Sequence, residues 1–376
     1  MAGIYIHIPF CKQACYYCDF HFSTSLKRKK EMLAAINTEL YLRKDEFENE
    51  KIETIYFGGG TPSMLSIHEI QSILDVVYRN FKVIANPEIT LEANPDDLTL
   101  KKITELSESP INRLSIGIQS FFEDDLKFMN RAHSAKESKK CLTDASQYFD
   151  NITIDLIYGV PNMTNEKWLE NLQRAFEFGV PHISSYALTV EEKTALANFI
   201  KKGKVPPLDE NLALQHYNIL LEQTEKQGFV HYEISNFGKP NYFSKHNKSY
   251  WLGEKYIGIG PSAHSFNGYE RSWNSSNNAT YIKELSESKL PSETEILSLN
   301  NRFNEYIMTG MRTIWGVSFQ KIKDDFGIDY LTSFQKGIQP FIKKDLLEIH
   351  AETQVVITTK KGKFMADGIA SELFIV

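Results

Sequence analysis

Two alternating patterns of hydrophobic and polar residues run through the first half of the chain. Short runs rich in β-branched and aromatic residues are separated by longer stretches in which apolar residues recur every three or four positions. The longer stretches predict amphipathic helices, the first of them over 26–48 with Leu33, Ile36 and Leu40 on one face. The short runs predict six strands, at 3–8, 54–57, 88–95, 113–120, 151–161 and 182–190.

Local signals define where several of these helices begin and end. Ser66 and Glu69, and again Ser134 and Glu137, have the spacing of a capping box at a helix start. Gly179 suits the position just after a helix that spans 165–178. Six successive strand and helix units imply a parallel sheet with right-handed crossovers. The fold class predicted for this part is therefore α/β, a partial (β/α)6 barrel of the TIM type.

The pattern changes after residue 190. A helix over 209–228 and a short strand over 230–237 are followed by a stretch rich in Asn, Ser, Gly and aromatic residues, and then by helices at 300–312 and 332–347. The last residues predict a strand, a Lys-Lys-Gly turn and a terminal helix. The predicted organisation is a core domain over 1–237, a connecting segment over 238–279, and a small C-terminal α/β domain over 280–376, for which a winged helix is one candidate fold.

Composition narrows the class of protein. With 376 residues, 42% of them hydrophobic and 24% charged, the chain can bury a large core. The net charge is −6 and "KRKK" at 27–30 is the one dense basic run, so nucleic acid is not an expected partner. No signal segment and no run of about 18 apolar residues occurs, which predicts neither export nor a membrane span and leaves peripheral membrane contact open.

The candidate chemistry begins with three cysteines close to the N-terminus. Cys11, Cys15 and Cys18 lie in "CKQACYYC", whereas Cys141 stands alone in a predicted helix, where it reads as a small buried hydrophobe. Thiolates this dense select zinc, copper(I) or an iron-sulfur cluster, and they require a reducing compartment such as the cytosol.

A zinc site would take His7 or His21 as its fourth ligand, but zinc sites usually combine two separated ligand pairs. A cluster held by four thiolates would need another cysteine, and position 20 is Phe. Three ligands for four irons would leave one iron open, as expected of a site that binds a substrate or cofactor directly.

Polar residues recur where the predicted strands end. The cysteines follow the first strand, Gly58, Gly59 and Gly60 follow the second, and the next three strands carry Glu92, Gln119 and Asp155 in or at their ends. Because the carboxyl ends of parallel strands share one face, five units present chemistry to a single mouth. Core packing alone does not require a charge inside "TLEAN" or "TIDLIYG".

The C-x3-C-x2-C spacing with an aromatic residue before the last cysteine resembles the cluster loop of radical S-adenosylmethionine (SAM) proteins. Within that superfamily the chain resembles the anaerobic coproporphyrinogen oxidase branch across "YIHIPFC", "YFGGGTP", "LEANP", "SIGIQSF", "RAH" and "IDLIYGVP". The resemblance implies a 4Fe-4S cluster on Cys11, Cys15 and Cys18. It also implies SAM contacts from Tyr5, Tyr17, Gly59, Gly60, Thr61, Glu92, Gln119, Arg131, Asp155 and Ala187.

Two departures separate the chain from the decarboxylase of that branch. The decarboxylase has a further cysteine where this chain has Phe20, and it begins with an extension that this chain lacks. In both respects the chain resembles the HemW-type heme chaperones, which also carry an H-N-x-x-Y-W motif. Residues 246–251 read His-Asn-Lys-Ser-Tyr-Trp. The resemblance implies that His246 is an axial ligand of heme and that Tyr250 and Trp251 pack on the macrocycle; His264 is a second candidate for a SAM or porphyrin contact.

The sequence therefore predicts a cytoplasmic protein that binds a 4Fe-4S cluster, SAM and heme, and that delivers heme to an acceptor protein. An electron donor for the cluster is implied, while productive SAM cleavage and the oligomeric state stay open. The alternative is an oxygen-independent coproporphyrinogen III oxidase, which Phe20 disfavours. A third hypothesis, a zinc-stabilised interaction protein, leaves Glu92, Gln119 and Asp155 unexplained.

Overall fold

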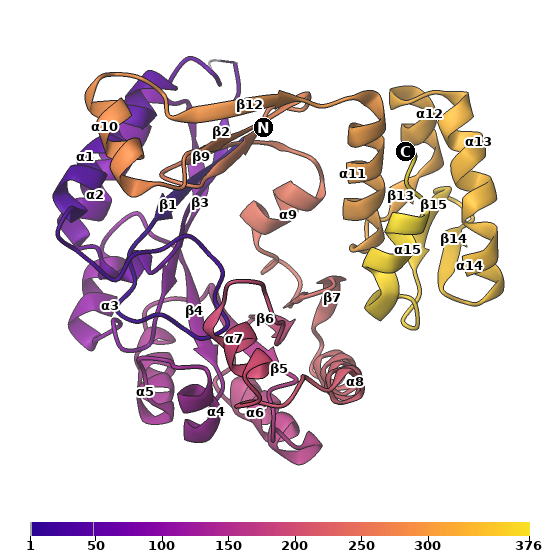
Figure 1. Cartoon of the computed structure of the whole chain (residues 1–376), viewed down its shortest axis with the longest axis horizontal. Helices are drawn as coiled ribbons and strands as arrows, with labels where there is room; N and C mark the ends of the chain where they lie inside the picture. Colours follow the sequence, from indigo (N-terminus) through magenta and orange to yellow (C-terminus); the bar gives the residue numbers. More distant parts are fainter. Residues whose placement is uncertain (1, 48) are drawn as a thin grey trace.

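The computed structural model describes residues 2–47 and 49–376. A central sheet of twelve strands has the order β12-β11-β10-β9-β1-β2-β3-β4-β5-β6-β8-β7 (Figure 1). All six predicted strands are present and pair in parallel with their neighbours in chain order. They are β1 (Ala2–Ile8), β2 (Ile52–Gly59), β3 (Val83–Ala93), β4 (Arg113–Gln119), β5 (Ile152–Tyr158) and β6 (His182–Ala187). The predicted partial barrel is confirmed.

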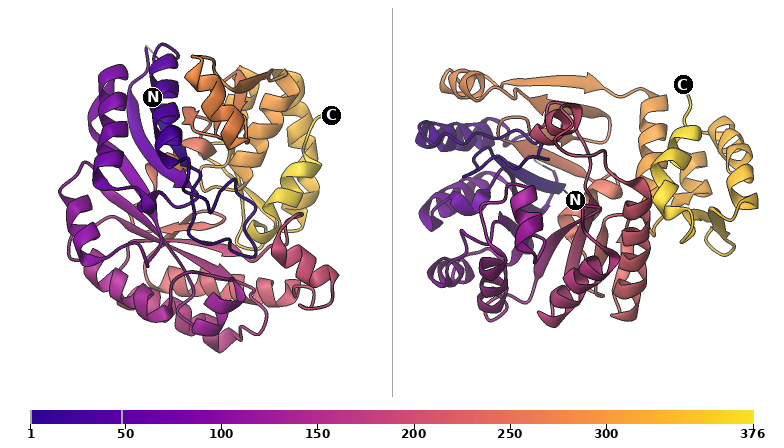
Figure 2. Two further views of the ribbon diagram at one scale, coloured as in Figure 1. Left: turned by 60° about the vertical axis from the view of Figure 1, so that its left-hand side comes forward. Right: turned by 60° about the horizontal axis from the view of Figure 1, so that its bottom comes forward.

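Helices cover the outer face of the curved sheet, as Figure 2 shows. Both predicted capping boxes are formed, at Ser66 with Glu69 and at Ser134 with Glu137. The first helix is shorter than the predicted 26–48. The helices of this part are α1 (Lys29–Leu42), α2 (Ile67–Asn80), α3 (Leu100–Ser107), α4 (Glu123–Phe128), α5 (Ala135–Ala145), α6 (Asn165–Glu177), α7 (Ala195–Lys201) and α8 (Glu210–Lys226).

The inner face of the strands, here called the lumen, is lined largely by polar side chains. Strand side chains alternate between faces, so Glu88, Thr90 and Glu92 of β3 share the inner face, and Thr153 and Asp155 of β5 do the same. The opposite faces carry the aliphatic core beneath the helices. We call the carboxyl ends of β1–β6 the upper end of the lumen and their amino ends the lower end.

Residues 238–279, predicted as a connecting segment, extend the sheet on the side of β1. Strand β9 (Lys255–Ile259) pairs in parallel with β1, and two antiparallel strands of this segment, followed by a third at 292–296, continue outward from it. The local pattern hid these strands because each is only three to five residues long. The remaining elements are β7 (Val230–Glu233), β8 (Asn236–Gly238), α9 (Lys245–Trp251), β10 (His264–Phe266), β11 (Glu270–Asn274), α10 (Asn278–Ser286) and β12 (Ser292–Ile296). The domain boundaries themselves stay a prediction.

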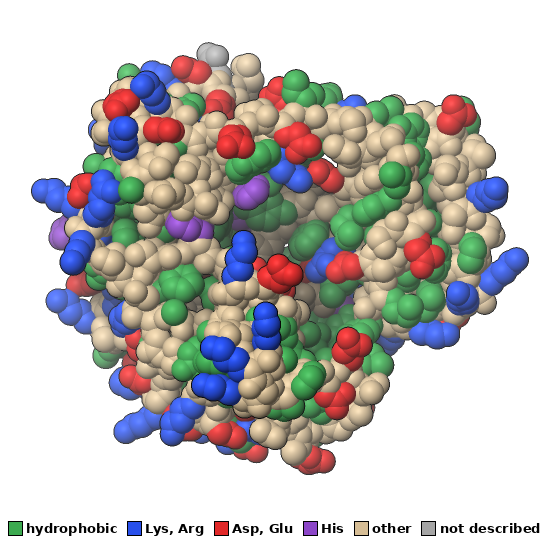
Figure 3. Space-filling model, in the orientation of Figure 1, with side chains coloured by type: hydrophobic (Ala, Val, Ile, Leu, Met, Phe, Trp, Pro, Cys, Tyr) green, Lys and Arg blue, Asp and Glu red, His purple; other side chains and the backbone are tan. Residues whose placement is uncertain are grey.

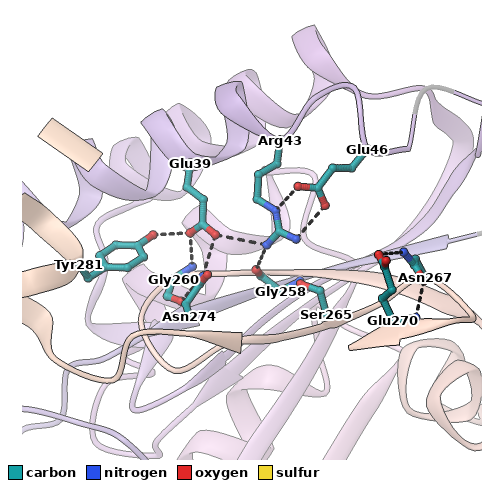
Figure 4. Close-up of polar contacts among 10 residues, drawn as sticks. All are labelled: Glu39, Arg43, Glu46, Gly258, Gly260, Ser265, Asn267, Glu270, Asn274 and Tyr281. Atoms are coloured by element: carbon teal, nitrogen blue, oxygen red, sulfur yellow. Dashed lines mark hydrogen bonds and ion pairs between the residues drawn. The ribbon is translucent and has the colours of Figure 1, made fainter. Parts of the chain in front are cut away.

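A buried polar network attaches this extension to α1 (Figure 4). The fully buried Glu39 carboxylate accepts hydrogen bonds from the backbone N of Gly260 (2.8 Å), from Asn274 Nδ2 (2.7 Å) and from the Tyr281 hydroxyl. Arg43 lies next to Glu39 and donates to the Gly258 carbonyl at 2.8 Å. A buried carboxylate with several donors is stabilised, so the network fixes β9 and β11 to the core.

The last part of the chain forms a small domain beside the barrel, with its own hydrophobic cluster. Its elements are α11 (Leu299–Met311), β13 (Val317–Ser318), α12 (Phe319–Asp325), α13 (Ile328–Gly337), α14 (Gln339–Lys343), β14 (Leu347–His350), β15 (Val355–Thr358) and α15 (Ala366–Glu372). The single helix predicted at 332–347 is wrong. A separate short helix begins at Gln339 with Pro340 in its first turn, because proline fits a first turn and not a helix interior, and the chain then enters β14.

Among the described residues, no helix is both long and apolar enough to cross a membrane.

Candidate cofactor site

The cysteine loop follows β1 at the upper end of the lumen and is anchored from two sides. Tyr16 donates its backbone N–H to the Met129 carbonyl (3.1 Å), and Asn130 Nδ2 donates to the carbonyl of Ala14 (2.7 Å). From the other side, the backbone N of Leu196 in α7 donates to the Tyr16 carbonyl at 2.8 Å. The loop is irregular, but these contacts fix its position at the mouth.

The thiols of the loop contact the residues that follow other strands. The Thr61 hydroxyl lies 3.4 Å from Cys11 Sγ, and Arg131 Nη1 lies 3.4 Å from Cys15 Sγ. Burial raises the pKa of Cys18 to about 11, and burial also raises the pKa of Cys11, with the neighbouring thiols adding to both effects. Thiols that share a half-buried mouth favour the thiolate form only when a cation is bound, so this donor set fits a metal centre.

The Gly58-Gly59-Gly60 turn brings backbone against the same loop. Gly59 has φ +102°, and a side chain there would meet the His7 ring at 2.5 Å. A side chain on Gly60 would meet the carbonyl oxygen of Phe10 at 2.6 Å. The predicted glycine turn and the predicted cysteine loop are therefore in contact, and both glycines are required by close packing.

Arg131 links the cysteine loop to β3 and β4. Its Nη2 donates to Asn94 Oδ1 (2.6 Å) and to the Gly117 carbonyl (3.0 Å), and its Nη1 lies 3.4 Å from the Tyr17 hydroxyl. Its Nε is buried and has no hydrogen-bond partner. A buried guanidinium with an unused donor is suited to an anionic ligand group at the mouth.

Two carboxyl groups face the lumen from neighbouring strands. Burial, with the proximity of Asp155, raises the pKa of Glu92 to about 7; burial raises the pKa of Asp155 to about 6. Glu92 accepts from the Tyr56 hydroxyl (2.8 Å) and from the backbone N of Gly59 (3.2 Å). These groups can accept hydrogen bonds from ammonium or hydroxyl groups, and a cationic ligand would lower both pKa values.

The remaining predicted contacts lie around this mouth. Tyr5 lies on the inner face of β1 with its ring 6.1 Å from that of Tyr56. Gln119 ends β4 with φ +62°, which is uncommon for a side chain other than glycine and re-aims the end of the strand. Ala187 ends β6 in register with Tyr158 of β5. The structure thus brings the predicted residues of β1 to β6 together at one end of the sheet.

Sequence reasoning missed two residues of this arrangement. Asn94 holds Arg131 and also donates from Nδ2 to Thr61 Oγ1 at 3.2 Å. Tyr56 holds Glu92 from below. Asn94 stands in the "LEANP" run that carried the resemblance, so that motif offered a signal; Tyr56, inside an apolar strand run, offered none.

The histidines near the cysteines do not point to a single-ion site. His7 Nε2 lies 2.9 Å from the His21 carbonyl oxygen, and His21 Nε2 lies 2.7 Å from Asn278 Oδ1. In residues 2–47 and 49–376, no three His, Cys, Asp or Glu side chains converge to hold one metal ion. Cys141 is buried in α5, as predicted.

His246 lies at the lower end of the lumen, in α9, away from the cysteine mouth. Its side chain is 0% exposed; Nδ1 lies 2.7 Å from Thr54 Oγ1, and Nε2 lies 2.7 Å from the Tyr250 hydroxyl. Trp251, at the end of α9, is partly buried beside the C-terminal domain, whereas His264 is exposed on β10. The heme assignment of His246, Tyr250 and Trp251 stays a prediction, and in this conformation both ring nitrogens of His246 are occupied.

Comparisons with known proteins give the superfamily and the fold. The Radical SAM superfamily model matches residues 5–175, and the HemN C-terminal domain model matches 297–358. The solved structure of coproporphyrinogen III oxidase (HemN) from Escherichia coli, described as a radical SAM enzyme, superposes with a TM-score of 0.85 at 22% identity. The superposition covers 99% of this chain and 90% of the HemN chain. The matched model and the fold are those of radical SAM proteins.

Full-length relatives define the family. The heme chaperone HemW of Bacillus subtilis (strain 168) is 33% identical over 98% of both chains, and that of Lactococcus lactis subsp. lactis (strain IL1403) is 34% identical over 97% of both. The chain belongs to the HemW family.

Proposed function

We propose that this protein is a heme chaperone that carries a 4Fe-4S cluster on Cys11, Cys15 and Cys18, binds SAM at the open iron, and passes heme to an acceptor protein. The observation that carries the cofactor part is the joining of the cysteine loop to the strand ends, through Thr61 at Cys11 and Arg131 at Cys15. The heme part is supported by the named HemW relatives and by the H-N-x-x-Y-W motif.

The lumen residues have distinct roles in this proposal. Arg131, with its unused Nε, pairs with the SAM carboxylate. Glu92 and Asp155 accept from the ammonium group or the ribose hydroxyls, and the glycine turn lets the ligand approach backbone. The other contacts in this set are Tyr5, Tyr17, Thr61, Gln119 and Ala187. When bound, the cluster supplies one electron to the sulfonium group.

A coproporphyrinogen III oxidase is the second candidate function, supported by the HemN structure. At 22% identity that likeness concerns the fold alone. Phe20, where the decarboxylase has a further cysteine, has a side chain 68% exposed to solvent and has no ligand chemistry. The chaperone function therefore fits the chain better.

The proposal includes partners and a location. A heme acceptor and an electron donor for the cluster are required by the function, and contact with a membrane surface would suit delivery to a membrane-bound acceptor. The free thiols of the loop fit a reducing compartment, the cytoplasm.

Anaerobic reconstitution tests both parts at once. We expect about four irons and four sulfides per chain, as a 4Fe-4S cluster requires, together with one bound heme. His246→Ala should lose the heme Soret band and keep iron and sulfide. Turnover of coproporphyrinogen III to protoporphyrinogen at enzyme-like rates would overturn the chaperone function, and one zinc without iron or sulfide would overturn the cluster.

A further inference from the structure

Helix α9 faces two ways. The backbone N–H groups at its start and the His246 ring face the lower end of the lumen, and its last residue, Trp251, lies against Arg312 beside the C-terminal domain. In Figure 1 the helix lies between the barrel and α11 of that domain. A helix of seven residues is not stable by itself, so contacts on these two sides hold it in place.

On the lumen side, α9 closes the barrel from below. The Glu88 carboxylate accepts from the backbone N of Lys245 (3.2 Å) and of His246 (3.1 Å), at the positive end of the helix. The His246 ring stacks on Tyr56, with the centroids 5.0 Å apart and an angle of 21°. Tyr56 is the residue whose hydroxyl holds Glu92, so α9 lies directly under the proposed SAM site.

On the opposite side, one arginine joins three parts of the chain. The Arg312 guanidinium, at the end of α11, lies 5.0 Å from the ring centroid of Trp251. It also donates to the buried Glu233 of β7 (3.1 Å) and to both oxygens of Asp367 in α15 (2.6 and 2.7 Å). A planar guanidinium suits all three contacts at once, which an ammonium cannot reproduce.

A second cation repeats this contact. Lys248 Nζ, in the same helix, lies 5.3 Å from the ring centroid of Trp315, just beyond α11. Beside α9, the surface is hollowed between the barrel and the C-terminal domain, and hydrophobic side chains lie in the hollow (Figure 3). A cavity of about 460 Å³ adjoins the first residue of α9 and is lined in part by Glu88, Phe243 and Lys245. The helix is thus held at two points and has space next to it.

We infer that α9 is a latch: Arg312 holds it in the closed position described here, and a planar iron macrocycle reaches His246 only when Arg312 releases Trp251 and α9 moves. This inference rests on the proposed heme function. His246 is 0% exposed and both its nitrogens are hydrogen-bonded, so iron cannot coordinate it without a rearrangement. The apparent affinity for heme is therefore the affinity of the open state multiplied by the fraction of molecules that are open.

The test weakens the latch while the fold is kept. Arg312→Lys retains a positive charge for the buried Glu233 and loses the planar contact with Trp251 and the paired bonds to Asp367. Lys248→Met removes the cation over Trp315 and keeps the stem. The matched control is Lys360→Gln, which removes an exposed ion pair with Glu225 between the same two parts of the chain without touching α9.

Heme titrations of the full-length variants, followed at the Soret band, measure the effect. An opening equilibrium made about tenfold more favourable should tighten the apparent Kd of Arg312→Lys about tenfold, with a smaller gain for Lys248→Met and none for Lys360→Gln. Amide hydrogen exchange over 245–251 should be faster in Arg312→Lys before any heme is added.

Two failures can be told apart. If His246→Ala binds heme as tightly as wild type, the heme assignment falls and the latch falls with it. If His246→Ala loses heme while Arg312→Lys shows neither tighter binding nor faster exchange in α9, the heme assignment stands and the latch alone is overturned.

Discussion

The two ends of the lumen differ in the state of the residues that are proposed to bind ligands. At the upper end, a buried Arg131 nitrogen lacks a partner, Glu92 and Asp155 have raised pKa values, and three free thiols lie on one loop. At the lower end, Glu88 caps α9 and both nitrogens of His246 are hydrogen-bonded, although the buried Nε of Arg113, the first residue of β4, has no partner there. The proposed heme ligand at the lower end is thus occupied in this conformation, whereas the Arg131 nitrogen proposed to meet SAM at the upper end is free.

The largest expected effect is on bound iron, and it distinguishes a cysteine of the proposed cluster from a cysteine buried in a helix. Cys15→Ala should reduce bound iron and sulfide to near background after reconstitution, because two thiolates do not hold a cluster of four irons. Cys141→Ala, in α5 and far from the mouth in sequence, should retain the full iron content and lose only some stability. Iron and sulfide analysis measures both; equal iron content in the two variants would contradict the assignment of the upper end.

The next prediction compares two carboxylates of one strand. Glu92→Gln should weaken SAM binding about 10- to 100-fold, since a charge-assisted hydrogen bond is worth roughly 1.5–3 kcal/mol. Glu88→Gln should leave SAM affinity within about threefold and lower the free energy of unfolding by about 1 kcal/mol, as loss of a helix cap does. Anaerobic calorimetry and urea unfolding measure these quantities. If Glu88→Gln also lost SAM, the two ends would not be independent.

The pH dependence sharpens the same comparison. The folded pKa of Glu92 is raised to about 7, so the folded state holds its proton more tightly than the unfolded state does. This contribution to stability is present below the unfolded pKa and is lost as pH rises through the folded pKa, so apo-protein stability should fall between about pH 5 and about pH 8. SAM affinity should rise over the same range, because the carboxylate is the form that binds an ammonium group.

The control for this prediction is Glu92→Gln, whose side chain mimics the protonated form. The fall in stability with pH, measured by urea unfolding, should be smaller in the variant than in wild type. Buried histidines such as His7, with a pKa lowered to about 4 by burial, act with the opposite sign, but they are common to both proteins and cancel in the difference. Identical pH profiles would show that Glu92 is not the titrating group.

The smallest expected effect concerns the residue between the two ends. Tyr56→Phe keeps the ring that stacks on His246 and removes the hydroxyl that donates to Glu92. Losing that donor should raise the pKa of Glu92 further and weaken SAM binding at neutral pH by a few fold, about 0.5–1.5 kcal/mol for one hydrogen bond. The midpoint of the SAM affinity against pH should move up. An unchanged midpoint would mean that the hydroxyl does not act on Glu92.

The upper end could be predicted because its residues follow regular elements. Once the alternation of strands and helices indicates a parallel sheet, the geometry of that sheet places Glu92, Gln119 and Asp155 on one edge, whatever the details of packing. The three cysteines lie within eight residues, so their proximity needed no tertiary information. Asn94, one residue beyond β3, was not predicted as a site residue because it acts by holding Arg131, which is 37 residues away in the chain.

The lower end could not be predicted in the same way. His246 reaches Thr54 from 192 positions along the chain, and Arg312 reaches Glu233 from 79. Strand β9 is five residues long and is defined by its pairing with β1, which no local pattern contains. Such contacts depend on how distant segments fold back, and the periodicity of hydrophobic residues carries no information about that.

The sequence by itself determined the parallel strands of the barrel and the residues at their carboxyl ends. Hydrophobic periodicity and helix caps are local, and a parallel sheet has one arrangement of strand ends. Only the tertiary structure decided that the H-N-x-x-Y-W residues form a helix that closes the opposite end, with His246 buried beneath Tyr56 and Trp251 held under Arg312. Burial and hydrogen bonding of a side chain depend on the residues that the fold places around it. A motif can therefore identify a residue that could bind iron, such as His246, without showing whether its ring nitrogens are free.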